Sequence, residues 1–171
     1  MNNVPTPHRI VIVGGGAGGL ELATRLGGDG VGHKVDITQI ERNRTHVWKP
    51  KLHEIAAGSM DFAVHEVDYL AQARRHRFRY RVGEMIDLDR ERRRILVAPS
   101  YDVEGREITP RCEFGYDPLV IAVGSQSDDG TPGVKEHAMT LESQADARRF
   151  QARMVDACIH AHAQGVPLRP A

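Results

Sequence analysis

The sequence predicts an α/β fold in which helices cover a parallel sheet and a small antiparallel β-meander is added to it. Three observations carry this prediction: an apolar run that ends in glycines, a second strand-like run one helix later, and alternating charged and apolar residues from position 77 onward. The 171 residues, 40% of them hydrophobic, are enough for one globular domain with its own core. We therefore expect a single domain over residues 1–171.

A βαβ unit is predicted at the start of the chain. Residues 9–13, RIVIV, are β-branched and stop abruptly at glycines, as a buried parallel strand does. Residues 19–26 then show helical spacing, and residues 34–41, KVDITQIE, alternate as a second strand. The four glycines between positions 27 and 32 are expected to end the helix and fill the loop before that strand.

The glycines after the first strand fit the pattern G-x-G-x-x-G. Gly14 turns the chain, Gly16 lets the backbone approach a pyrophosphate, and Gly19 permits close packing of the helix on the strand. The helix that begins there, with Ala17 and Gly18 in its first turn, offers free N–H groups and a partial positive charge to an anion. The pattern favours a Rossmann-like dinucleotide site over a plain structural turn.

An acidic residue stands where such a site needs one. Glu41 closes the second strand 22 residues beyond Gly19, and a carboxylate there accepts hydrogen bonds from an adenosine ribose. This residue argues against a 2′-phosphate on the ligand, although Arg42 beside it keeps that alternative open. The fingerprint does not decide between FAD and NAD, because both use it.

A second apolar strand, residues 116–125 (YDPLVIAVGS), leads into small residues. A small-residue exit lets the end of a strand lie close against a bound cofactor, which makes Ala122, Gly124 and Ser125 candidate contacts. The stretch resembles the second signature of flavoproteins that carry two nucleotide-binding domains, the first of which holds FAD. FAD is therefore the favoured cofactor.

Three longer segments, residues 41–61, 68–85 and 130–150, resemble type II NADH dehydrogenases, the single-subunit NADH:quinone oxidoreductases of the pyridine nucleotide-disulfide oxidoreductase superfamily. The resemblance covers nearly the whole chain. It implies an oxidoreductase that passes a hydride from NADH through FAD to a quinone, on an FAD/NAD(P)-binding fold. It also implies that Trp48, Lys49 and Pro50 contact the isoalloxazine and ribityl groups, and it adds Met85 to the candidate cofactor contacts.

The resemblance implies that residues 1–171 form an FAD-binding domain that stops before an NADH-binding domain, because no second G-x-G-x-x-G occurs. We expect the chain alone to be inactive, and no catalytic residue is predicted. NADH and quinone would be partners of the full-length protein, which would be cytoplasmic and peripheral on the cytoplasmic face of the inner membrane. An exposed apolar sheet edge would also favour a homodimer.

The sequence disfavours several other kinds of protein and binding site. The charge is balanced, with 23 basic and 23 acidic residues, so there is no electrostatic argument for nucleic acid. Cys112 and Cys158 share no CxxC spacing and indicate neither a disulfide framework nor a metal knuckle. His46 and His53 are interrupted by Pro50, so no metal site is predicted. No apolar run approaches the roughly 20 residues of a spanning helix.

The rest of the chain predicts further elements. Residues 77–82 alternate arginine with Phe78, Tyr80 and Val82, which indicates a half-buried strand with a charged outer face rather than a single-stranded nucleic-acid platform. Residues 87–114 predict the meander, with a hairpin tip at 104–105. Ser143 and Asp146 form a capping box for a helix that runs to about position 164 and packs on the core.

Three alternatives stay open. The chain could belong to an FAD/NAD-dependent reductase with another acceptor, of the sulfide:quinone or ferredoxin type. It could be a non-catalytic nucleotide-binding module. It could also be a small NAD-binding protein, although no Tyr-x-x-x-Lys or similar acid–base pair occurs.

Overall fold

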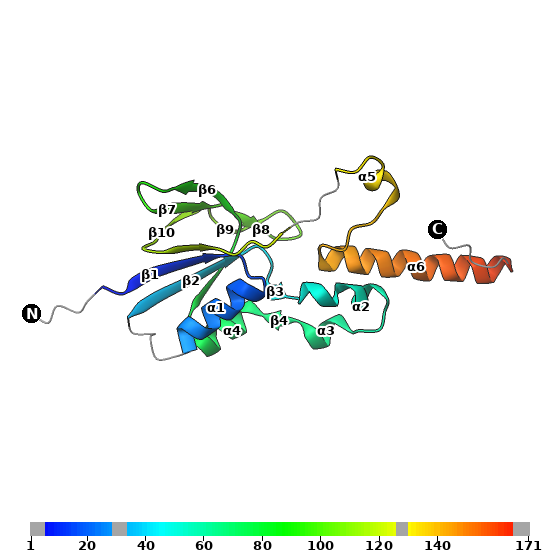
Figure 1. Cartoon of the computed structure of the whole chain (residues 1–171), viewed down its shortest axis with the longest axis horizontal. Helices are drawn as coiled ribbons and strands as arrows, with labels where there is room; N and C mark the ends of the chain where they lie inside the picture. Colours follow the sequence, from blue (N-terminus) through cyan, green and yellow to red (C-terminus); the bar gives the residue numbers. More distant parts are fainter. Residues whose placement is uncertain (1–5, 29–33, 126–129, 166–171) are drawn as a thin grey trace, which may run out of the picture. The chain divides into compact units, whose positions relative to one another are not determined.

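The computed structural model describes residues 6–28, 34–125 and 130–165 (Figure 1). The chain divides into two compact units. Unit 1 comprises Met1–His46 and Val67–Gly124, and unit 2 comprises Val47–Glu66 and Ser125–Ala171. The predicted glycine fingerprint lies in unit 1. None of the helices in the described part of the chain combines the length and the apolar character that crossing a bilayer requires.

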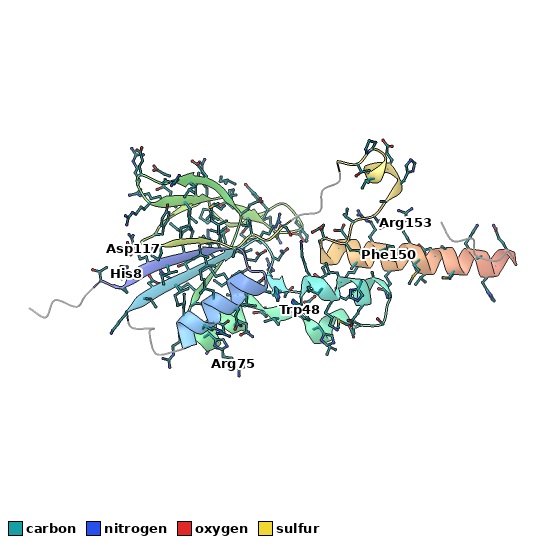
Figure 2. The ribbon with its side chains drawn as sticks, viewed as in Figure 1. His8, Trp48, Arg75, Asp117, Phe150 and Arg153 are labelled. Atoms are coloured by element: carbon teal, nitrogen blue, oxygen red, sulfur yellow. The ribbon has the colours of Figure 1, made fainter. Side chains whose placement is uncertain are left out.

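A four-stranded parallel sheet forms the centre of unit 1, in the order β11-β1-β2-β5. The later parts of its middle strands are buried, as in a parallel sheet covered on both faces, and on β2 they include the polar Thr38 and Gln39. Asp117 ties the start of β1 to the segment before β11, because its carboxylate accepts a hydrogen bond from the Arg9 N–H at 2.8 Å; Figure 2 shows His8 and Asp117 at the same end of the sheet. The strands are β1 (His8–Val13), β2 (Val35–Glu41), β5 (Arg79–Val82) and β11 (Leu119–Ile121).

Two helices, α1 (Ala17–Gly28) and α4 (Tyr69–His76), cover one face of this sheet (Figure 1). Helix α4 begins at the N-cap Asp68, whose carboxylate accepts a hydrogen bond from the backbone N–H of Ala71 at 2.7 Å. The short strands β3 (Thr45–His46) and β4 (Val67–Asp68) pair just before it. The core between sheet and helices consists of buried Ile12, Ala23, Ile37, Ala73 and Phe78.

The three-stranded antiparallel sheet β10-β7-β6 covers the other face (Figure 1). Its strands are β6 (Met85–Asp89), β7 (Arg94–Val97) and β10 (Cys112–Gly115), and β8 (Ser100–Tyr101) and β9 (Glu107–Thr109) form a separate hairpin. The predicted α/β fold with a meander on the parallel sheet is therefore confirmed. The second core consists of buried Val11, Val13, Ile40, Ile95, Val97 and Tyr116.

Unit 2 is built around helix α6 (Gln144–Gln164), which starts at the predicted capping box and ends at Gly165. Ala147 in the first turn of this helix packs with Leu52, Ile55 and Ala56 in a small core. Beyond that point the helix is solvated, and Phe150 in Figure 2 is 37% exposed, so the expectation that the whole helix packs on the core is wrong. The other elements are η2 (Lys49–Lys51), α2 (Leu52–Ala56), α3 (Phe62–His65) and α5 (Val134–His137).

Three local predictions differ in detail from the structure. Helix α1 ends at Gly28, within the predicted glycine run, but Gly27 itself lies in the last turn. A Cβ there would overlap the backbone carbonyl of His76, so Gly27 permits close packing of the helix. Arg81 is half-buried, because its guanidinium donates to the Pro110 carbonyl at 2.9 Å and to the Cys112 sulfur. The strand predicted for residues 116–125 is shorter, and Gly30 and Gly32 lie outside the described residues.

Candidate dinucleotide-binding site

The glycine loop between β1 and α1 is held tightly on its inner side. Gly14 has a φ of 105°, a conformation that favours glycine, and its N–H donates to the Ile40 carbonyl at 2.8 Å. A Cβ at Gly14 would overlap the Ala122 carbonyl, and a Cβ at Gly19 would overlap the Gly14 carbonyl oxygen. Two of the fingerprint glycines are therefore needed by packing within the chain itself.

The outer side of the same loop is open. Gly16, Ala17 and Gly18 are exposed, and within the described residues their backbone N–H groups have no hydrogen-bond acceptor. A Cβ at Gly16 or Gly18 would meet nothing within 4 Å. Free donors at the start of a helix, with space in front of them, form an anion-binding site suited to a phosphate.

Glu41 lies at the end of β2 and bonds to the loop directly. Its Oε2 accepts a hydrogen bond from the N–H of Gly15 at 2.7 Å. Its Oε1 accepts two more, from the backbone N–H of Asn43 at 3.0 Å and from the Asn43 side-chain amide at 2.7 Å. An ionised carboxylate offers about four acceptor positions, so one on Oε2 is left for a ribose hydroxyl.

Three ring side chains lie beneath the loop. The Tyr69 hydroxyl donates to the Gly15 carbonyl oxygen at 2.5 Å and lies 3.4 Å from Nδ1 of His46. The Tyr69 ring stacks on Tyr80 with centroids 5.2 Å apart, and the Tyr80 hydroxyl donates to the Asn43 carbonyl at 2.5 Å. Both backbone polar groups of Gly15 are thus bound, the N–H by Glu41 and the carbonyl by Tyr69, and they belong to two successive peptide units.

Burial sets the protonation of these rings. Desolvation, helped by the negative charge of Glu41, raises the pKa of Tyr80 to about 12 and raises the pKa of Tyr69 further. Desolvation also lowers the pKa of His46, opposed by hydrogen bonding to the Gly15 backbone and by the charge of Glu41. Both tyrosines are therefore neutral hydrogen-bond donors at physiological pH.

The other candidate cofactor contacts of unit 1 lie at different distances from the glycine loop. Ala122 follows β11 directly, and its N–H donates to the Val13 carbonyl at 2.7 Å, so the structure brings it against Gly14 and Gly19. Gly124 adopts a φ of 76° just beyond it. Met85 starts β6 and packs against the core under the parallel sheet, and Arg42 is exposed next to Glu41.

The remaining candidates belong to unit 2. Trp48, Lys49 and Pro50 enter the short helix η2, and the Trp48 side chain is 53% exposed (Figure 2). The Lys49 ammonium donates to the Ser125 carbonyl at 2.9 Å and to Oε2 of Glu142 at 2.5 Å, so Lys49 and Ser125 are in direct contact. Their contact with an isoalloxazine ring stays a prediction.

Sequence reasoning missed Gly15, Asn43 and Tyr69. Gly15 lies outside the G-x-G-x-x-G spacing, and only the structure shows that a Cβ there would overlap the Tyr69 hydroxyl and crowd Glu41. Tyr69 is 54 positions from Gly15, so no local pattern links them. The available signal was Asp68, a good N-cap residue that places Tyr69 at the start of a helix.

The family is decided by a match over most of the chain. Residues 8–162 match the model of the pyridine nucleotide-disulphide oxidoreductase family. The chain belongs to this family. The match includes the loop and Glu41, and it agrees with the resemblance drawn from the sequence.

The curated relatives with similar sequences are named as type II NADH:quinone oxidoreductases. The chain is 44% identical over 149 residues to the type II NADH:quinone oxidoreductase of Haemophilus influenzae, which covers 86% of this chain and 34% of that protein. It is 29% identical over 152 residues to the corresponding NdhA protein of Mycobacterium tuberculosis, covering 88% of this chain and 30% of that protein. The chain thus spans about a third of the length of the curated relatives it matches.

Solved structures support the fold. The NDH2 protein of Plasmodium falciparum, solved in complex with NADH, superposes with a TM-score of 0.74 at 23% identity and covers 92% of this chain and 30% of its own. The sulfide:quinone oxidoreductase of Aquifex aeolicus gives a TM-score of 0.71 at 20% identity, over 89% of this chain and 32% of its own. At these identities the likeness establishes the architecture of the pyridine nucleotide-disulphide oxidoreductases, which is shared by enzymes with different substrates.

Proposed function

We propose that this chain is the FAD-binding part of an NADH:quinone oxidoreductase, in which a hydride from NADH passes through FAD to a quinone. The observation that carries the proposal is the glycine loop, with Glu41 beside it and three N–H groups on its open side that have no acceptor among the described residues. The 44% identity to the Haemophilus influenzae protein supports the choice of NADH and quinone over other reactants.

The residues present fit FAD. The N–H groups of Gly16, Ala17 and Gly18 would bind the pyrophosphate, and the open space in front of Gly16 admits it. The last acceptor position of Glu41 would take one ribose hydroxyl. Trp48, Lys49 and Pro50 are proposed as flavin contacts from the resemblance alone. Met85 and the small residues Ala122, Gly124 and Ser125 are proposed as further cofactor contacts.

FAD, when bound, supplies the ring that accepts the hydride and releases the electrons to the acceptor. The described residues of this chain bind and orient that cofactor. We infer no catalytic residue in the chain. We also expect no NADH oxidation by the 171 residues alone, since they contain a single G-x-G-x-x-G.

The partners and location follow from this proposal. NADH and a membrane-dissolved quinone would be the substrates of the whole protein, which would bind peripherally at the cytoplasmic face of the inner membrane. A homodimer is part of the proposal as well. The names of the curated relatives, which are NADH:quinone oxidoreductases, support NADH and quinone as the substrates.

Titration of the purified chain with FAD and, separately, with NADH tests the proposal. We expect FAD to change its fluorescence on binding and to raise the melting temperature, because a ligand that binds only the folded state stabilises it. NADH should have little effect. Stabilisation by NADH alone would contradict the flavoprotein assignment and favour a small NAD-binding protein.

Reductases that act on sulfide or persulfide receive weaker support. The sulfide:quinone and persulfide reductases among the similar structures share the fold at 20% and 21% identity and say nothing about substrate. Chemistry on sulfide would need a reactive thiol. Cys112 starts β10, where its sulfur accepts a hydrogen bond from Arg81, and Cys158 lies on α6, so neither belongs to the glycine loop.

A further inference from the structure

The hydroxyl of Tyr69 is buried beneath the glycine loop. Tyr69 is 2% exposed, and its hydroxyl donates to the Gly15 carbonyl oxygen at 2.5 Å. A buried hydroxyl that bonds a loop carbonyl fixes the orientation of that peptide, because leaving either group unpaired would cost free energy. The ring itself is held by stacking on Tyr80 and by an edge contact with His46.

The carbonyl of Gly15 and the N–H of Gly16 belong to one trans peptide unit and point in opposite directions. Tyr69 holds that carbonyl inside the protein, so the Gly16 N–H is turned outward, and Glu41 holds the preceding peptide unit through the Gly15 N–H. The following N–H groups, from Gly16 to Gly18, are the ones left free on the exposed side. Tyr69 therefore helps the loop to present its first donor, the Gly16 N–H, because it holds the other polar group of the same peptide unit.

We propose that Tyr69 is a positioning residue for the pyrophosphate of the bound dinucleotide, acting through the Gly15 carbonyl. This inference rests on the proposed function, since it assumes that the loop binds a dinucleotide. Tyr69 does not touch the ligand. It fixes the backbone whose N–H groups do, and preorganised donors bind an anion more tightly than donors that must first be ordered.

The variant Tyr69→Phe tests the proposal, with Tyr116→Phe as the matched control. Phenylalanine keeps the stacked ring and removes only the hydroxyl. Tyr116 is also buried, at 8% exposure, but belongs to the core on the opposite face of the sheet. FAD affinity is measured by flavin fluorescence well below the melting temperature, and we expect Tyr69→Phe to weaken it by about five- to tenfold, as for the loss of one hydrogen bond. Tyr116→Phe should bind FAD as the unchanged chain does.

A second readout separates positioning from general stability. ADP carries the pyrophosphate and adenosine does not, so Tyr69→Phe should weaken ADP and leave adenosine binding unchanged. A lower melting temperature together with unchanged FAD and ADP affinities would overturn the proposal and leave Tyr69 a packing residue. If the unchanged chain binds no dinucleotide, the proposed function and this inference both fail; if it binds and Tyr69→Phe binds equally, only this inference fails.

Amide hydrogen exchange on the unchanged chain keeps the proposal testable if Tyr69→Phe does not fold. The Gly15 amide should be protected without FAD, because Glu41 accepts its proton. The Gly16 and Gly18 amides should exchange quickly and become protected when FAD is added. Protection of the Gly16 amide in the absence of FAD would show that the peptide unit bound by Tyr69 is not turned outward, and would overturn the inference.

Discussion

Each oxygen of the Glu41 carboxylate accepts hydrogen bonds from the chain itself. Gly15 and Asn43 supply three donors between them, so Glu41 organises the loop in addition to its proposed contact with a ribose. The sequence predicts the ribose contact from the position of Glu41 at the end of a strand. It gives no sign of the contact with Gly15, because that contact depends on how the loop folds back across the end of the sheet.

Because Glu41 also bonds to the glycine loop, replacing it should lower the stability of the chain even when no ligand is bound. Glu41→Gln turns an amide toward one of the donor groups, so at least one hydrogen bond is lost and the free energy of unfolding should fall by about 1–3 kcal/mol. Urea unfolding of the FAD-free chain measures this. Unchanged stability, with weaker FAD binding only, would show that Glu41 serves the ligand alone.

The buried tyrosines predict how stability depends on pH. The pKa values of Tyr69 and Tyr80 are raised above 10, the ordinary value, so the folded state keeps these protons where the unfolded state releases them. The contribution of these two protonated tyrosines to the free energy of unfolding is fully present below pH 10. It is lost as the pH rises through 10 toward about 12 and beyond. We expect tyrosinate absorbance from these two residues to appear together with unfolding. Ionisation of both near pH 10 in a folded chain would contradict their burial.

At the scale of elements, the strands and helices with strong local signals were predictable. The strand at residues 9–13, the helix after it and the capping box at Ser143 all agree with the structure, because each depends on neighbours in sequence. The contact between α1 and α4 was not predictable. Gly27 was read as a helix terminator, whereas its role depends on His76, which lies 49 positions away along the chain.

Adjacent glycines at the end of α1 provide a matched pair of variants. A Cβ at Gly27 would overlap the His76 carbonyl, so Gly27→Ala should destabilise the chain by roughly 1–3 kcal/mol through overpacking. A Cβ at Gly28 would meet only Nδ1 of His76, at 3.8 Å, so Gly28→Ala should be neutral or stabilising by up to about 1 kcal/mol. Thermal unfolding of both variants checks this, and equal effects would count against the packing of α1 on α4.

At the scale of the whole molecule, the fold was predicted from the fingerprint and the strand pattern, and the family match agrees with it. The cofactor contacts of Trp48, Lys49 and Pro50 rest on resemblance, because no local rule links those residue types to a flavin. In the described residues, β11 pairs with β1 alone, and Ile121 on it is 55% exposed. The sheet therefore has an apolar edge available for pairing.

That edge predicts self-association. We expect sizing experiments on the purified chain to show a dimer whose fraction rises with concentration. Ile121→Lys places a charge on the edge and should shift the equilibrium toward monomer. A chain that is monomeric at every concentration tested would count against the edge as an interface.

The variant Gly16→Val tests most directly whether the glycine loop binds the dinucleotide. The space in front of Gly16 is empty, so the larger side chain should leave the melting temperature of the FAD-free chain nearly unchanged, as Gly28→Val should at the far end of the same helix. Because the valine would occupy the position of the pyrophosphate, FAD affinity should fall at least about tenfold, or ~1.4 kcal/mol. Full FAD affinity in a folded Gly16→Val chain would contradict the assignment of this loop as the binding site.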